Sequence, residues 1–343
     1  MRFTIIPLFL LFFFFTACEK KPQDNNQPPL IEKGKGVFIL NEGNFQWGNA
    51  SVSYYRTDNN TLYDDIFNTI NNRHLGDVCQ SMYIYNDKAY IIVNNSQKIE
   101  VVDVNTFQSI STINGLASPR YFLPVSQTKA YVSDMSSNAV SIIDLNTNTK
   151  TGEIPCSGSN EEMLLLNNKV YITNTSTSYL YIADALTDHI TDSIHLSYGT
   201  VSVKLDNTAK LWVLCMGNQA DHTNAALYKV NPANNSIELS LPFTTPLNVW
   251  NKIKMNQNCD TMYFSNGNVF RMKTTDNQLP HDTLIKSGNR NFYGLGVDPG
   301  NGYLYISDAI DYVQEGKIYV YSPNGDFIKT FNAGIIPGEF CFY

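Results

Sequence analysis

The side chains of this sequence that could do chemistry are mostly aromatic and amide groups in turn-rich segments. Aromatic rings offer broad apolar faces and their polar neighbours offer hydrogen bonds, so together they suit a large, flat organic ligand with a polar rim. The alternative is that single rings of the set only pack between structural elements. The predicted ligand-binding residues are Asn44, Phe45, Trp47, Arg120, Tyr121, Tyr179, Tyr198, Asn218, His222, Trp250, Tyr293 and Tyr312.

Patterns for catalysis or metal binding are weaker than this aromatic set. The sequence contains no GxSxG, HExxH, P-loop or GxGxxG motif. His222, beside Asp221, is the one histidine that we expect on the binding face. We therefore predict no catalytic residue, no metal site and no cofactor, apart from a bound organic ligand.

The N-terminal segment predicts export and lipidation. Arg2 precedes an apolar run at residues 5–15, which is too short to span a bilayer because about 20 residues are needed. Small residues before Cys18 resemble a bacterial lipobox, which implies cleavage before Cys18 and lipidation of its thiol. The alternative is an ordinary signal peptide with an accidental cysteine. We expect a lipoprotein signal peptide at 1–17, a flexible tether at 18–35 and one folded domain at 36–343.

Composition limits the class of protein that must position these groups. Aromatic residues make up 13% of the chain and charged residues only 16%, which excludes a disordered tail or a coiled coil. The net charge of −7 argues against nucleic acid as a partner. The 40 asparagines favour turns, so we expect many short elements. Beyond Cys18, five scattered cysteines without a CxxC motif favour free thiols, with one disulfide as the alternative.

A repeated phrase predicts the architecture. An aromatic residue followed by apolar residues and then Asn or Asp recurs about every 40–52 positions. These seven aromatic anchors are Phe38, Tyr90, Tyr131, Tyr171, Trp212, Tyr263 and Tyr305. Further strand patterns flank most anchors, and four short strands in a period of about 40 residues match one β-propeller blade. We predict an all-β, seven-bladed propeller of four-stranded blades, since stacked blades cover faces that one blade leaves open.

The two ends of the repeat pattern predict how the ring closes. Blade one begins at its second strand, Gly36 to Asn41, and has no first strand before it. The C-terminal IIPGEFCFY resembles the start of a further blade, so it should become the innermost strand of blade one. In this arrangement the loops between second and third strands and the loops between blades share one face. This loop face should carry the predicted ligand-binding residues.

An asparagine or aspartate also occurs three residues after most anchors in the sequence. These oxygens could surround a cation on the axis, or they could form Asx turns that satisfy backbone N–H groups. We favour Asx turns because the positions of Val93 and Cys215 lack such oxygens. The other positions are Asn41, Asp134, Asn174, Asn266 and Asp308.

Two stretches resemble known propellers. AYVSDMSSNAVSIIDLNTNTKTGEIP, residues 130–155, is similar to the YVTN-type surface propeller repeat. GVFILNEGNFQWGNASVSYY, residues 36–55, resembles the opening of a family of outer-membrane lipoprotein propellers, some of which capture vitamin B12. The resemblance covers residues 36–343. It implies a lipid-anchored outer-membrane protein, a corrinoid ligand and a TonB-dependent transporter as partner. The mixed charges of Glu19, Lys20 and Lys21 leave the cell surface and the periplasmic face both open.

Three classes of function are compatible with the sequence. The first is capture of a ligand, with a corrinoid as the leading candidate. The second is a protein-interaction or structural propeller of the cell envelope. The third is a propeller enzyme such as a lyase or lactonase. We favour ligand capture and a non-enzyme, because no combination of acid, base and metal ligands stands out.

Overall fold

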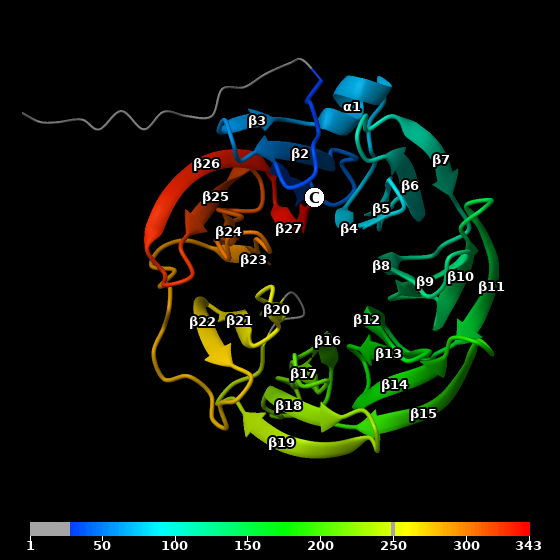
Figure 1. The fold of residues 1–343 in the computed structure, drawn as a ribbon, viewed down its shortest axis with the longest axis vertical. Coiled ribbons are helices and arrows are strands. Elements are labelled where there is room, and N and C mark those ends of the chain that lie inside the picture. Colours follow the sequence, from blue (N-terminus) through cyan, green and yellow to red (C-terminus); the bar gives the residue numbers. More distant parts are fainter. Residues whose placement is uncertain (1–27, 248–250) are drawn as a thin grey trace, which may run out of the picture.

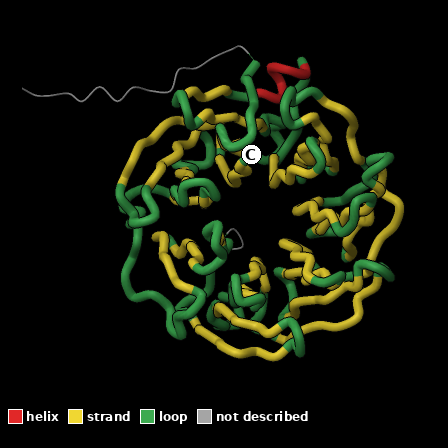
Figure 2. Tube along the Cα trace, in the orientation of Figure 1, coloured by secondary structure: helices red, strands yellow, loops and turns green. Residues whose placement is uncertain are grey.

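Seven antiparallel β-sheets stand like blades around a central channel in a computed structural model, which describes residues 28–247 and 251–343 (Figure 1). The predicted all-β, seven-bladed propeller is confirmed. Figure 2 shows strands around the whole ring and a short helix at its edge. Among the described residues, no helix is long and apolar enough to cross a membrane.

Each blade runs from an innermost strand beside the channel to an outer strand at the rim. From the channel outward, blade one consists of β27 (Pro337–Phe342), β1 (Gly36–Asn41), β2 (Ser51–Arg56) and β3 (Thr61–Tyr63). Blade two consists of β4 (Cys79–Tyr85), β5 (Lys88–Val93), β6 (Lys98–Asp103) and β7 (Ser109–Ile113). Blade three consists of β8 (Pro119–Pro124), β9 (Lys129–Asp134), β10 (Ala139–Asp144) and β11 (Thr149–Pro155). Blade four consists of β12 (Asn160–Leu166), β13 (Lys169–Asn174), β14 (Tyr179–Asp184) and β15 (His189–His195). Blade five consists of β16 (Thr200–Leu205), β17 (Leu211–Cys215), β18 (Ala226–Asn231) and β19 (Ser236–Pro242). Blade six consists of β20 (Lys254–Met255), β21 (Thr261–Asn266) and β22 (Asn268–Lys273), and blade seven consists of β23 (Phe292–Val297), β24 (Leu304–Asp308), β25 (Glu315–Tyr321) and β26 (Phe327–Ile335).

The aromatic anchors hold the blades together. All seven lie on the second strand of their blade and are at most 3% exposed. Stacking occurs across blade boundaries: Tyr90 of blade two lies 4.1 Å, ring centroid to centroid, from Phe122 of blade three. Tyr55 and Phe331 stack in the same way between blades one and seven, at 4.2 Å. The core is therefore a ring of interblade clusters, as expected where each blade covers its neighbour.

The C-terminal strand closes the ring. Strand β27 pairs antiparallel with β1, with Cys341 opposite Phe38 and Phe340 opposite Ile39, which confirms the predicted closure. Figure 1 shows the C-terminus beside the channel, between β27 and the start of β1. Both ends of the folded domain therefore stabilise one blade.

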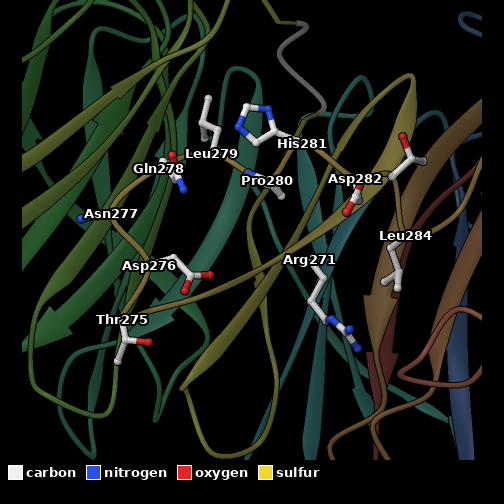
Figure 3. A pocket seen from close by; sticks show the side chains of 11 residues that line it. Arg271, Thr275, Asp276, Asn277, Gln278, Leu279, Pro280, His281, Asp282 and Leu284 are labelled. Carbon is white, nitrogen blue, oxygen red and sulfur yellow. The ribbon is translucent and has the colours of Figure 1, made fainter.

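Blade six departs from the prediction of four strands, since three are described. Its outer strand is reduced to a single bridge between Val269 and Ile285. Ile285 is buried and fills the place that Ile113, Ile154 and Ile194 fill in blades two, three and four. The chain between β22 and this bridge arches outward and lines a cavity of about 610 Å³ together with Arg271 (Figure 3). Pro280, in the middle of this segment, disfavours a regular strand.

The connection between β3 and β4 contains a short helix. Helix α1 (Ile66–Asn71) follows β3, and the side chain of Asp65 accepts a hydrogen bond from the Asn68 N–H at its start. Arg73 then forms two hydrogen bonds of 2.8 Å with Glu100, a buried carboxylate of β6. This ion pair fastens the insertion to blade two.

Candidate functional site

A polar cavity of about 240 Å³ opens at the channel on the loop face. Four residues of the predicted set line it, namely Phe45, Arg120, Tyr121 and Tyr293. They come from blades one, three and seven, so the ring brings together side chains from distant parts of the sequence. Figure 1 looks along this channel and shows the innermost strands that form its wall.

Irregularities in the innermost strands help to aim side chains into the channel. The pairing register shifts near the start of β4, β8, β12, β16 and β23, and at the junction of β27 with β1. A β-bulge bends its strand and redirects neighbouring side chains. In β8 the shift lies between Pro119 and Phe122, so the two residues within it are Arg120 and Tyr121, which both line the cavity.

One wall of the cavity is basic. Arg120 donates from Nε to Glu161 at 2.7 Å and from one terminal nitrogen to Gln80, while Nη2 makes no hydrogen bond to a described residue. Lys252 contacts the other Glu161 oxygen at 3.2 Å and lies 5.4 Å from the Tyr121 ring centroid. Burial alone would raise the pKa of Glu161, but these two cations lower it, so the carboxylate is charged.

Two further ion pairs continue this polar belt around the channel. Glu162 accepts hydrogen bonds from Ser202 at 2.7 Å and from Lys204 at 2.8 Å, and its pKa is lowered to about 2 against the effect of burial. Lys254 pairs with Glu339 of β27 and so joins blade six to blade one. The charges of this belt come from five blades, and each of its carboxylates pairs with at least one cation.

Glu42 differs from the carboxyl groups of the polar belt because no cation forms a salt bridge with it among the described residues. Both of its oxygens lie 3.1 Å from the hydroxyl of Tyr293, which can donate its one proton to either. Burial raises the pKa of Glu42 from its ordinary 4.5 to about 7, although Tyr293 and Arg120 oppose this shift. Glu42 therefore changes charge near neutral pH.

Exposed aromatic rings surround one side of the cavity. Phe45 is 63% exposed and Trp47 is 77% exposed on the loop after β1, and Tyr312 is 42% exposed on the loop after β24. The Asn44 side chain donates a hydrogen bond of 2.7 Å to the carbonyl oxygen of Tyr312. The Tyr312 ring meets the Tyr293 ring edge to face at 5.8 Å. We call Phe45, Trp47 and Tyr312 the aromatic rim.

The other described residues of the predicted set do not line this cavity. Tyr179 lies on β14 and packs against Tyr181 and His195, at centroid distances of 6.0 and 5.2 Å. Tyr198 lies half-buried before β16. Asn218 and His222 belong to the exposed loop of blade five, where Asn218 bonds to Asp221 at 2.6 Å. Trp250 and the lipidation site Cys18 lie outside the described residues. Ligand binding by the whole set stays a prediction.

Several of the Asn and Asp residues after the anchors act as turn caps. Asp134 accepts four backbone hydrogen bonds, from Ala117, Ser118, Ser136 and Ser137. Asp308 accepts from the N–H groups of Asn291 and Ile310. These bonds fit the Asx-turn interpretation. In the part of the chain that the structure describes, no group of three His, Cys, Asp or Glu residues could hold a metal ion. The five described cysteines are free thiols.

Apart from Arg120, sequence reasoning missed the charged residues of the cavity. Glu42, Lys252 and Glu339 line it, and Glu161 lies beneath it, yet none was predicted. A signal was present: Arg120, Glu161 and Lys252 each fall just before or within an innermost strand, where a solvent-facing charge is not expected. Nothing in the sequence alone indicated that strand irregularities would direct them inward.

Comparison with known proteins supports the fold and leaves the chemistry open. Residues 35–335 match a family described as "Domain of unknown function (DUF5074)". No curated protein matches the sequence. Among solved structures, a quinonprotein alcohol dehydrogenase-like protein from Bacteroides thetaiotaomicron is similar with a TM-score of 0.70 and 15% identity, covering 90% of this chain and 78% of that chain.

Two other solved structures show the same likeness. A functionally unknown protein from Desulfotomaculum acetoxidans has a TM-score of 0.63 and 10% identity, over 90% of this chain and 98% of that chain. Hydrazine synthase from Kuenenia stuttgartiensis has a TM-score of 0.61 and 14% identity, over 74% of this chain and 85% of that chain. At identities this low the likeness concerns the fold alone, because propellers host unrelated functions.

Proposed function

The chain belongs to the DUF5074 family, and from its own side chains we propose that it captures a large, planar, polar-rimmed ligand on its loop face, with a corrinoid such as vitamin B12 as the leading candidate. The aromatic rim beside a charged cavity is the observation that carries this proposal. Exposed rings with few rotatable bonds lose little entropy on binding, and they provide much of the binding energy in such interfaces. The corrinoid identity comes from the resemblance of residues 36–55 to vitamin B12-capturing propellers.

The position of the rim supports contact with a large ligand. Phe45, Trp47 and Tyr312 are exposed, yet their two loops are tied together by the Asn44 hydrogen bond. Exposed aromatic side chains on two loops that are joined in this way commonly mark a binding surface. The ring of blades holds both loops from below, so the rim is largely organised before a ligand arrives.

We also propose that the protein is an envelope lipoprotein that delivers its ligand to a TonB-dependent transporter. The described N-terminal segment supports an orientation in which the rim faces away from the membrane. Arg56, at the end of β2 away from the loop face, binds the carbonyl of Leu30 at 3.0 Å and Glu32 at 2.8 Å. A lipid on Cys18 would thus hold the propeller by the face opposite the rim and leave the rim facing away from its membrane. The cell surface remains our preferred location, with the periplasmic face as the alternative.

A protein-interaction role is the second candidate, because Val313, next to Tyr312, is also exposed and widens the apolar patch. A protein partner would use the rim but would not need the cavity beneath it. A propeller lyase or lactonase would instead need Glu42 and Tyr293 as an acid and base pair, and we propose no such activity.

Calorimetric titration of the full chain in detergent with cyanocobalamin tests the capture proposal. Binding heat at micromolar ligand, lost on Trp47→Ala, is the expected result. Absence of heat and of any thermal stabilisation at about 100 µM would reject the corrinoid, since a ligand that binds the folded state must stabilise it. It would favour the protein-interaction candidate.

A further inference from the structure

The cavity is too small for the body of a large planar ligand, and this limits what it can hold. Its volume of about 240 Å³ lies below the ~300–1,000 Å³ of sites for drug-sized ligands. A ligand seated on the aromatic rim could place only one side arm inside. The chemistry of the walls then decides which arm is accepted. This inference rests on the proposed function, and it concerns the arm alone.

An acidic wall and a basic wall face each other across the cavity. Glu42 and Glu339 come from blade one, where the absence of a side chain at Gly338 leaves room for Glu42: a Cβ there would lie 2.6 Å from its Oε1. Arg120 and Lys252 are anchored on the far side, where Arg120 reaches Glu161 of blade four and Lys252 reaches the Val201 carbonyl of blade five. Figure 1 shows β27 on one side of the channel and β12 and β16 across from it.

Each wall retains unused hydrogen-bonding capacity. On the basic side, Arg120 donates from Nε and Nη1 and keeps Nη2 free of any bond to a described residue. On the acidic side, Tyr293 is the one described residue that donates to the Glu42 carboxyl group, and its hydroxyl satisfies one of several lone pairs. An occupant therefore meets a donor on one side and an acceptor on the other.

Charge complementarity excludes most kinds of arm. Above about pH 7, where Glu42 is charged, a carboxylate would be attracted by Arg120 but repelled by Glu42, and an ammonium group would be attracted by Glu42 but repelled by Arg120. A methyl group would leave buried polar groups unpaired, which disfavours its binding. A neutral group with an acceptor at one end and donors at the other satisfies both walls at once.

We infer that the cavity receives a primary carboxamide arm, whose carbonyl oxygen accepts from Nη2 of Arg120 and whose N–H₂ group donates to the carboxylate of Glu42. In this arrangement the Glu42 carboxylate accepts from both the Tyr293 hydroxyl and the amide, and the arm itself carries no charge. Tyr293 is a positioning residue, because its hydroxyl holds Glu42 from the side of blade seven. The site thereby selects amide-bearing ligands over their hydrolysed acids.

Small-molecule probes test this selectivity without reference to the whole ligand. The full chain, labelled with ¹³C-tyrosine, would be titrated at pH 8, where Glu42 is charged, with acetamide, acetate and methylammonium while the Tyr293 and Tyr121 ring signals are followed by NMR. We expect acetamide to shift these signals with at least about tenfold higher affinity than either ion. Equal or tighter binding of acetate or methylammonium would overturn the inference.

Substitution of Glu42 supplies a second readout that a merely structural role would not move. Glu42→Gln removes the charge that repels acetate. The ratio of acetamide affinity to acetate affinity should therefore fall by about tenfold or more in this variant. Glu153→Gln, an exposed carboxyl of β11, is the matched control and should leave all three affinities unchanged. An unaltered acetamide-to-acetate ratio in Glu42→Gln would also overturn the inference.

The outcome separates this inference from the proposed function. Cyanocobalamin binding without amide selectivity would leave ligand capture standing and remove the carboxamide site. Amide selectivity without cyanocobalamin binding would support the site and reject the corrinoid. The monocarboxylic acids of cyanocobalamin provide the decisive comparison, since at least one should bind at least about tenfold more weakly than the parent amide.

Discussion

Gly294 of blade seven lies so close to Gly338 of blade one that a Cβ atom on Gly294 would sit 2.5 Å from the Gly338 carbonyl oxygen. The neighbouring atom belongs to the backbone of β27, so it cannot move aside as a flexible side chain could. This contact lies where the last complete blade meets the C-terminal strand. The ring therefore closes through a close approach of two main chains.

This contact predicts that Gly294→Ala destabilises the propeller. The added methyl group forces β23 and β27 apart, and overpacking of this kind typically costs about 1–3 kcal/mol. Gly152→Ala on β11 is the control, because its nearest neighbour would be a side-chain carbon at 3.4 Å, an ordinary contact. Urea unfolding of both variants measures the difference. Equal stability of the two variants would show that β27 can shift freely.

Glu161 predicts a second effect on stability. It binds both Arg120 and Lys252 and is almost completely buried. Glu161→Ala leaves two cations without their partner, and breaking a buried ion pair typically costs about 3–5 kcal/mol. Glu153→Ala removes the partner of Lys150 on the surface, where a loss below about 1 kcal/mol is expected. Chemical denaturation should rank the two clearly, and a loss as small for Glu161 as for Glu153 would contradict the role of the belt.

The ring itself could be predicted from sequence because each blade repeats one buried aromatic residue. Tyr131 and Tyr171 sit at equivalent places on β9 and β13, and their spacing needs no knowledge of the other blades. Ring closure followed from the unmatched second strand at Gly36. Local periodicity is thus sufficient where each unit contacts only its neighbours.

The cavity could be predicted only in part, for a physical reason. Phe45 and Tyr293 were predicted because aromatic residues in or beside turn-rich segments stand out by residue type, although Tyr293 lies on β23. Glu42 and Lys252 meet only after seven blades have closed, and no local pattern brings them together. The missing outer strand of blade six was overlooked for a similar reason: Ile285 alone substitutes for a strand, and one apolar residue has no periodicity.

The aromatic rim predicts where binding energy is concentrated. Trp47→Ala and Tyr312→Ala should each weaken cyanocobalamin binding by at least about 2 kcal/mol, roughly thirtyfold, because such rings act as anchors. Tyr179→Ala provides the control, since that ring packs on its own blade and does not line the cavity. Calorimetry on the three variants compares them directly. A loss for Tyr179 equal to that for Trp47 would move the binding surface to blade four.

Glu42 predicts how stability depends on pH. The titratable or charged groups around it are Tyr293, Arg120, Lys252, Glu339 and Cys79. Burial raises its pKa from 4.5 in the unfolded chain to about 7 in the folded protein. Between these values the folded state binds more protons than the unfolded state. Stability must therefore fall as the pH rises through this window, and the loss is complete above about pH 7.

The comparison of the parent with Glu42→Gln isolates this contribution. Glutamine does not titrate, so the free energy of unfolding of the variant minus that of the parent should grow between pH 5 and pH 8. Glu162 does not interfere, because its pKa is lowered to about 2 and its stabilising effect is lost only in more acidic solution. Urea unfolding at the two pH values gives the difference, in which the effects of shared groups cancel. A difference that stays constant from pH 5 to pH 8 would mean that Glu42 keeps an ordinary pKa, and that water reaches it in the folded protein.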